Sequence, residues 1–225
     1  MTPSQAVIFD MDGVLVDSYH AHFESWNILA AETGCRYSRE DFVAGFGRTS
    51  REVLAEQWPP ALLATHSIEQ LDSRKEQIFR GLIAADFPAM RGATALIKSL
   101  YNSGWLLAVG SSGPPENVAQ VLASLEVESY IQARVTGADV TRGKPDPQVF
   151  RMSAERLNVP PSRCIVIEDA PAGVKAAHAA GMICVGLVST GRTREDLADA
   201  DLLVNELTDI EPATLGRLLE RRRSA

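Results

Sequence analysis

The sequence predicts an α/β fold with a doubly wound, parallel-sheet (Rossmann-like) core and an inserted helical cap domain. From about residue 90 onward, short apolar segments alternate with segments of helical spacing. These apolar segments are continuous, as is typical of strands that are buried on both faces of a parallel sheet. Between about residues 19 and 86 the spacing is helical and strand-like runs are almost absent, which predicts the insert.

The expected elements follow in a regular order along the chain. The first strand is expected at residues 6–10, directly before the insert. The insert has helical spacing, punctuated by Gly34 and the pair Pro59–Pro60, at residues 20–34, 50–58 and 60–85. The later strands are expected at 105–111, 133–137, 164–169, 182–188 and 200–205. The later helices are expected at 93–104, 114–125, 146–158 and 171–181.

The insert is too long for a plain connection between two strands, so it should fold as a unit of its own. We therefore expect two domains. Residues 1–17 and 87–225 would form the Rossmann-like catalytic core, and residues 18–86 would form the helical cap.

Composition excludes several classes of function. The chain has 225 residues, a net charge of −7 and a pI of about 5.2, which disfavours broad nucleic-acid binding because that usually needs a basic face. No apolar run approaches about 20 residues, so no membrane span is expected, and the N-terminus lacks the pattern of a secretion signal. Three scattered cysteines fit reduced thiols better than disulfides or a zinc site. We expect a cytoplasmic monomer.

Polar side chains follow several of the predicted strands. Ligands of open parallel sheets bind beyond the carboxyl ends of the strands, so residues at those ends should meet. The residues in such positions, together with one lysine from a loop between a strand and a helix, are Asp10, Asp12, Ser111, Ser112, Lys144, Glu168 and Asp169.

These residue types point to phosphoryl chemistry. Clustered carboxylates repel one another and call for a hard cation such as Mg²⁺, which commonly also binds substrate phosphate. A serine before a helix N-terminus and a lysine both suit a phosphate group. Taken singly, each motif reads more simply as a turn, a helix cap or a surface lysine. The chain has four such groups near the ends of predicted strands: Asp10 with Asp12, Ser111 with Ser112, Lys144, and Glu168 with Asp169. Their occurrence together, in this order, is harder to explain as unrelated turns and caps.

Four motifs carry a resemblance to a known family. They are DMDGVLVDS (residues 10–18), AVGSS (108–112), GKPDP (143–147) and VIEDAPAGVKAAHAAGM (166–182). With them the chain resembles the haloacid dehalogenase superfamily of phosphohydrolases, most closely the β-phosphoglucomutase-like branch. The likeness covers nearly the whole chain, including the insert, which looks like that family's cap.

The resemblance implies a role for each motif residue. Asp10 resembles the nucleophile that becomes an aspartyl phosphate, and Asp12 the general acid/base, with a backbone carbonyl that resembles a Mg²⁺ ligand. Asp10 and Asp169 resemble metal-binding carboxylates, and Glu168 matches a ligand of the mutase branch. The phosphate-binding residues implied are Ser111, Ser112 and Lys144. The implied substrate is a small phosphate ester, and the implied cofactor is Mg²⁺.

The cap segment carries further candidates and one departure from the mutase group. His22 aligns with a histidine used near the moving proton donor, although it could equally be a hydrogen-bonded helix residue at a domain interface. Arg48 and Arg51 could reach substrate or could be solvated residues at a helix start. The mutase group has a lysine before the glycine of this segment, whereas this chain has Phe46 before Gly47.

Because a mutase must hold a bisphosphate intermediate, lost positive charge in the cap favours a phosphatase acting on a sugar phosphate. A β-phosphoglucomutase-type mutase is the alternative. Two non-enzymatic classes rank behind both. A receiver-like signalling module would place its phosphorylated aspartate after the third strand, and a degenerate binding module would have lost Asp10, Asp12 or Asp169.

Overall fold

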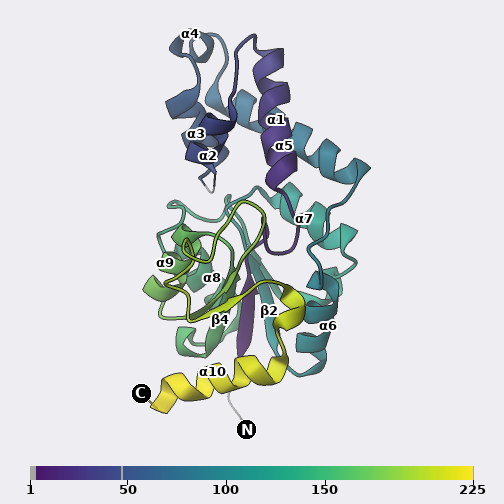
Figure 1. The fold of residues 1–225 in the computed structure, drawn as a ribbon, viewed down its shortest axis with the longest axis vertical. Helices are drawn as coiled ribbons and strands as arrows, with labels where there is room; N and C mark the ends of the chain where they lie inside the picture. Colours follow the sequence, from purple (N-terminus) through teal and green to yellow (C-terminus); the bar gives the residue numbers. More distant parts are fainter. Residues whose placement is uncertain (1–3, 47, 225) are drawn as a thin grey trace. The chain divides into compact units, whose positions relative to one another are not determined.

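The computed structural model describes residues 4–46 and 48–224. The chain divides into two compact units (Figure 1). One, the sheet unit, consists of Met1–Asp17 and Ala89–Ala225, and the other, the helical unit, consists of Ser18–Pro88.

The sheet unit contains six parallel strands in the order β3-β2-β1-β4-β5-β6. Their bounds are β1 Ala6–Phe9, β2 Leu106–Gly110, β3 Ala133–Val135, β4 Cys164–Glu168, β5 Ile183–Leu187 and β6 Leu202–Val204. Ala6 of the central strand β1 is level with Leu106 of β2 on one side and Cys164 of β4 on the other. Every residue of β1 and β4 is buried, as expected for strands covered on both faces. The predicted doubly wound parallel sheet is confirmed.

Helices cover both faces of this sheet. α8 packs against β1, β2 and β3 and α9 against β4 and β5, and in Figure 1 they lie on the other side of the sheet from α6 and α7. The helices of the sheet unit are α6 Ala93–Asn102, α7 Pro115–Ser124, α8 Gln148–Leu157, α9 Pro171–Ala179 and α10 Pro212–Ser224, with 3₁₀ turns η1 Glu128–Tyr130, η2 Pro161–Arg163 and η3 Leu207–Asp209.

The strand order indicates where on the sheet a ligand should bind. The chain moves from β1 to β2 and β3 on one side and then returns to β4, β5 and β6 on the other. Ligands bind at such a topological switch point, beyond the carboxyl ends of the strands. The ends of β2, β1 and β4 are neighbours there, and the end of β5 is next to that of β4.

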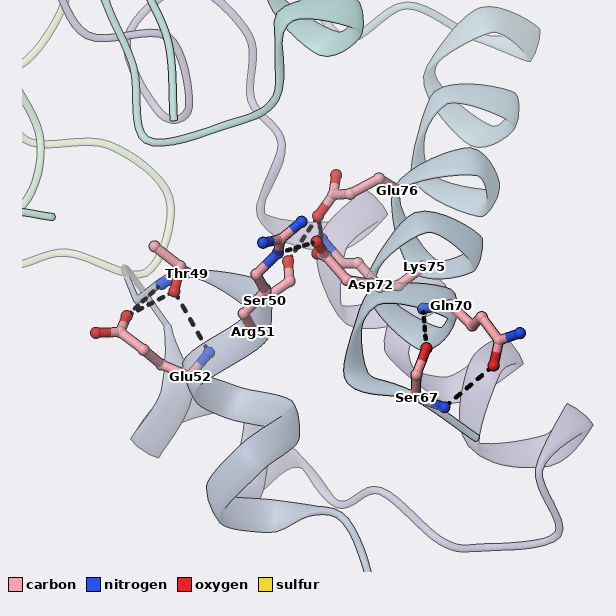
Figure 2. Close-up of polar contacts among 9 residues, drawn as sticks. All are labelled: Thr49, Ser50, Arg51, Glu52, Ser67, Gln70, Asp72, Lys75 and Glu76. Atoms are coloured by element: carbon pink, nitrogen blue, oxygen red, sulfur yellow. Dashed lines mark hydrogen bonds and ion pairs between the residues drawn. The ribbon is translucent and has the colours of Figure 1, made fainter. Parts of the chain in front are cut away.

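The helical unit contains α1 Tyr19–Glu32, α2 Arg39–Gly45, α3 Ser50–Gln57, α4 Pro60–Leu63 and α5 Ile68–Ala85. α1 and α5 pack together around an apolar core that includes Trp26, Leu29 and Leu71. The stretch of helical spacing at 60–85 is divided because Ser67 begins α5 with a capping box to Gln70 (Figure 2). A second helix start that the apolar spacing did not predict, that of α2, is also fixed by a capping box.

None of the helices within residues 4–46 and 48–224 combines the length and the apolar character that crossing a bilayer requires.

Candidate functional site

A lysine joins two carboxylates at the carboxyl edge of the sheet. Asp10 follows β1 directly, and its backbone N–H donates to the carbonyl of Ile167 in β4, which holds the two strand ends together. The ammonium of Lys144 donates to Oδ1 of Asp10 at 2.7 Å and to Oε1 of Glu168 at 2.6 Å. The Lys144 side chain is only 7% exposed, so one cation is buried between two anions.

Asp169 adds a third carboxylate to this edge. Ligand oxygens of Asp10, Glu168 and Asp169 all lie within 4.8 Å of one another, and the three residues are buried. The loop after β1 approaches Asp169 closely because Gly13 has no side chain: a Cβ built on Gly13 would lie 2.0 Å from Oδ2 of Asp169. Gly13 also has φ of +73°, a conformation that glycine adopts without strain.

Burial and the proximity of like charges shift the pKa values of the residues in this cluster. Burial raises the pKa of Asp10 well above its ordinary value; Lys144 opposes the rise, and Glu168 and Asp169 add to it. Burial and then Glu168 raise the pKa of Asp169 to about 7, against the opposing effects of Arg192 and Ser189. Burial alone would lower the pKa of Lys144, but Asp10 and Glu168 outweigh it and hold that pKa above its usual value.

The donor set fits a hard divalent cation. Three buried carboxylates face one lysine, so the cluster carries more negative than positive charge when the carboxylates are ionised. Oxygen ligands at this spacing are those that Mg²⁺ and Ca²⁺ prefer. Asp10, Glu168 and Asp169 are therefore the residues whose side chains could hold a cation, whereas the side chain of Asp12 is outside this group.

The loop after β2 supplies hydroxyl and backbone groups on the other side of β1. Ser111 is buried, and its Oγ accepts from the backbone N–H of Gly113 at 3.0 Å, while Ser112 is half-buried. A Cβ built on Gly113 would lie 3.3 Å from Oγ of Ser111 and 3.9 Å from Oδ2 of Asp12. Asp12 also raises the pKa of Asp10 through its charge. The two motifs thus meet at one end of the sheet.

Two residues at this edge were missed by sequence reasoning. The hydroxyl of Ser189 donates to Oδ2 of Asp169 at 2.7 Å, and Nε of Arg192 lies 4.0 Å from the same oxygen. Both follow β5, next to β4. The signal available was their position after a predicted strand, but the order of the strands was needed to use it.

The candidates in the helical unit are arranged differently. Phe46 packs in an aromatic cluster, with ring centroids 5.0 Å from Tyr19 and 5.1 Å from Phe42. Gly47 lies outside the described residues. Arg48 pairs with Glu56 at 2.6 Å, and Arg51 pairs with Asp72 at 2.9 Å (Figure 2).

His22 is half-buried and contacts a buried ion pair within the helical unit. Its Nδ1 lies 2.8 Å from Nζ of Lys75, and its ring stacks on Phe79 at 4.0 Å. Lys75 pairs with Glu76 at 2.8 Å, and the same carboxylate oxygen accepts from the hydroxyl of Ser50 at 2.6 Å (Figure 2). Burial alone would raise the pKa of Glu76, but Lys75, His22 and Ser50 together lower it to about 2. Sequence reasoning did not single out Lys75 or Glu76.

A groove of about 880 Å³ lies elsewhere on the sheet unit, between α10 and the amino ends of the strands. Its lining includes Gln5, Trp105 and Arg163, which precede β1, β2 and β4. The carboxylate cluster is at the opposite end of these strands, so this groove is not part of the candidate site.

Comparison with known proteins gives consistent matches. The sequence model of the haloacid dehalogenase-like hydrolase family matches residues 5–181. The chain is 35% identical over 215 residues to validoxylamine A 7′-phosphate phosphatase of Streptomyces hygroscopicus subsp. limoneus, covering 94% of this chain and 98% of that one. It is 35% identical over 185 residues to the phosphorylated carbohydrates phosphatase of Thermotoga maritima, covering 79% and 82%.

A solved structure matches over the full length. The crystal structure of β-phosphoglucomutase from Clostridium difficile superposes with a TM-score of 0.84 at 25% identity, covering 99% of this chain and 100% of that one. The chain is therefore similar both to phosphatases and to a phosphomutase.

Proposed function

This chain belongs to the haloacid dehalogenase-like hydrolase family, and we propose that it is a Mg²⁺-dependent phosphatase that hydrolyses a small phosphorylated sugar through an aspartyl phosphate on Asp10. The observation that carries the proposal is the Lys144 bridge between Asp10 and Glu168, beside Asp169, at the carboxyl edge of the sheet. A receiver-like module has no support from the family match.

Asp10 is the proposed nucleophile. One of its carboxylate oxygens attacks phosphorus, and the bond from phosphorus to the leaving oxygen breaks while Asp12 gives that oxygen its proton. Asp12 then accepts a proton from a water molecule, which attacks the phosphorus and releases Asp10 and inorganic phosphate. The side chain of Asp12 lies beside the loop that contains Ser111 and Gly113. This position, next to the proposed phosphate-binding loop, supports a proton-transfer role for Asp12.

Positive charge is needed to bring an anionic substrate to three carboxylates. Lys144 offsets the charge of Asp10 and of the phosphoryl group, and Ser111 donates its hydroxyl to a phosphate oxygen. Asp10, Glu168 and Asp169, with the backbone carbonyl of Asp12, would hold Mg²⁺. When bound, Mg²⁺ supplies charge neutralisation at this edge.

The helical unit is proposed to act as the cap that chooses the substrate. Two relatives are named as phosphatases, one of validoxylamine A 7′-phosphate and one of phosphorylated carbohydrates, and the second name supports a sugar phosphate as the substrate.

A phosphomutase is the second candidate, because the chain resembles β-phosphoglucomutase along its whole length. Two observations within the helical unit favour the phosphatase. Phe46 contributes an aromatic ring to an apolar cluster instead of a cation, and the guanidinium groups of Arg48 and Arg51 are each paired with an acidic side chain. A second phosphate would have to compete with Glu56 and Asp72 for them.

The test is a screen of phosphate monoesters with Mg²⁺ and with chelator, in which released phosphate is measured. It includes glucose 1-phosphate with a bisphosphate primer, and glucose 6-phosphate is followed in the same reaction. We expect net phosphate release that is lost in chelator and abolished in Asp10→Asn. Faster formation of glucose 6-phosphate than of phosphate would establish the mutase instead, and hydrolysis by a clean Asp10→Asn protein would exclude Asp10 as the nucleophile.

Phe46→Lys separates the two reactions further. If position 46 faces the acceptor, adding a cation there should raise transfer relative to hydrolysis. An unchanged ratio of the two products would place Phe46 in the aromatic cluster only.

A further inference from the structure

A tight turn after β5 reaches the carboxylate cluster. The backbone N–H of Arg192 donates to the carbonyl of Ser189 at 3.1 Å, and Gly191 in the third position of this turn has φ of +81°. That position of a type II turn needs positive φ, which glycine supplies. The turn directs both of its end residues toward Asp169: Ser189 through its hydroxyl and Arg192 through its guanidinium.

The turn is also anchored to the loop that follows β1. The hydroxyl of Thr190 donates to Oδ2 of Asp17 at 2.7 Å. Asp17 is the last acidic residue of the motif that begins with Asp10, and the proposed reaction gives it no task. Its hydrogen bond with Thr190 gives Asp17 a structural role. Strands β1 and β5 are not neighbours in the sheet, yet this bond joins the loops that follow them.

Asp169 is consequently held from two sides. Gly13 lies against its carboxylate from the loop after β1, and the Ser189 hydroxyl binds Oδ2 from the turn after β5. Both Asp169 and Ser189 are buried. The bond to Oδ2 restricts rotation of the carboxylate and so fixes the direction in which its oxygens face the other two carboxylates. Without this bond, repulsion by Glu168 and Asp10 would favour other rotamers of Asp169.

We propose that the turn Ser189–Arg192 is a positioning element for the divalent cation, in which the Ser189 hydroxyl fixes Asp169 as a ligand and Thr190 anchors the turn on Asp17. The inference rests on the proposed Mg²⁺ dependence. Groups that orient a metal ligand, without touching the metal, typically change metal affinity by about 10- to 100-fold when they are removed. Ser189 is thus a positioning residue, and its effect should appear in metal binding itself.

The experiment is a Mg²⁺ titration of the full-length protein by isothermal calorimetry, repeated as the Mg²⁺-induced rise in melting temperature. We expect Ser189→Ala to bind Mg²⁺ at least about tenfold more weakly than the parent protein. Ser189→Thr, which keeps the hydroxyl, should remain within a few-fold of the parent. Thr193→Ala is the matched control, since it removes a hydroxyl of the same segment that contacts the exposed Asp196 and not Asp169.

The possible outcomes separate this inference from the proposed function. Equal Mg²⁺ affinity of the parent and Ser189→Ala would overturn the positioning role while leaving the metal site standing. A parent protein that binds no Mg²⁺ would overturn both. If Ser189→Ala does not fold in chelator, Ser189→Cys takes its place, because a thiol is only a weak donor and the same weakening is expected.

Discussion

Asp169→Asn should make the metal-free protein more stable and at the same time remove its response to Mg²⁺. The amide keeps an oxygen that can accept the hydrogen bond from Ser189, and it removes the charge that burial and Glu168 disfavour. Activity and stability are expected to change in opposite directions, as happens when a functional site is electrostatically strained.

The sign and the size follow from the two pKa values of Asp169. Below pH 3.8 the carboxyl is protonated in both the folded and the unfolded protein and has no effect on stability. Between 3.8 and about 7 the unfolded chain has lost this proton while the folded protein keeps it, so the free energy of unfolding falls as pH rises. Each pH unit in that window corresponds to about 1.4 kcal/mol, which gives on the order of 4 kcal/mol by pH 8.

The assay is thermal unfolding in chelator at pH 4 and at pH 8. At pH 8 the melting temperature of Asp169→Asn should exceed that of the parent by roughly 10 °C, taking about 2–4 °C per kcal/mol for a chain of this size. At pH 4 the difference should nearly vanish. Addition of Mg²⁺ at pH 8 should raise the melting temperature of the parent and leave the variant unchanged.

Asp199→Asn is the matched control, since it makes the same chemical change at an exposed position of the sheet unit. It should shift neither melting temperature measurably. A destabilised Asp169→Asn protein at pH 8 in chelator, or the same gain at pH 4 as at pH 8, would refute the electrostatic reasoning.

Three further outcomes are expected. Lys144→Met, which keeps the length of the side chain without its charge, should lower kcat by at least about 100-fold, measured with saturating substrate and Mg²⁺. Ser111→Ala should lower kcat/KM by about tenfold, by the loss of one hydrogen bond to a charged group, without changing Mg²⁺ affinity. Glu76→Gln should destabilise the helical unit by about 3 kcal/mol in urea unfolding because it leaves Lys75 buried without its anion. Glu32→Gln, at an exposed ion pair, should cause no measurable change.

The sequence was sufficient for the strands and for the residues at their carboxyl ends. Continuous apolar runs such as Ala6–Phe9 and Cys164–Ile167 are typical of strands buried on both faces, and a parallel sheet then brings their carboxyl ends to one edge. Asp10, Lys144, Glu168 and Asp169 lie together there for that reason.

The turn after β5 could not be predicted in the same way. Ser189-Thr190-Gly191-Arg192 has the composition of an ordinary turn, and nothing local distinguishes it from other serine- and glycine-containing turns in the chain. Its contact with Asp169 depends on β5 lying beside β4, which is a property of the strand order. The contact between this turn and Asp169 therefore follows from the tertiary structure and cannot be predicted from the local sequence.

The burial of Lys75 and Glu76 in the helical unit could not be predicted, because the sequence around them is highly charged. Lys75 and Glu76 lie in the charged segment Asp72–Gln77, which reads as a solvated helix face. Packing of α1 against α5 instead leaves the Lys75 side chain 2% exposed, between the rings of Trp26 and Phe79. The number of charges in a helix does not reveal which of them a second helix will cover.

Burial has opposite effects on the pKa values of the two units' carboxylates, so a cation at the proposed metal site should shift the pH at which the protein is most stable. In the helical unit Glu76 has its pKa lowered from 4.5 to about 2, so its contribution to stability is complete above pH 4.5 and is lost as pH falls toward 2. In the sheet unit Asp169 has its pKa raised to about 7, so the metal-free protein loses stability as pH rises from 3.8. The two windows overlap between pH 3.8 and 4.5, so the combined contribution of the two clusters to the stability of the metal-free protein is largest near pH 4. A divalent cation on Asp10, Glu168 and Asp169 would favour the ionised form of these carboxylates, so it would offset only the second effect and move the optimum toward neutral pH.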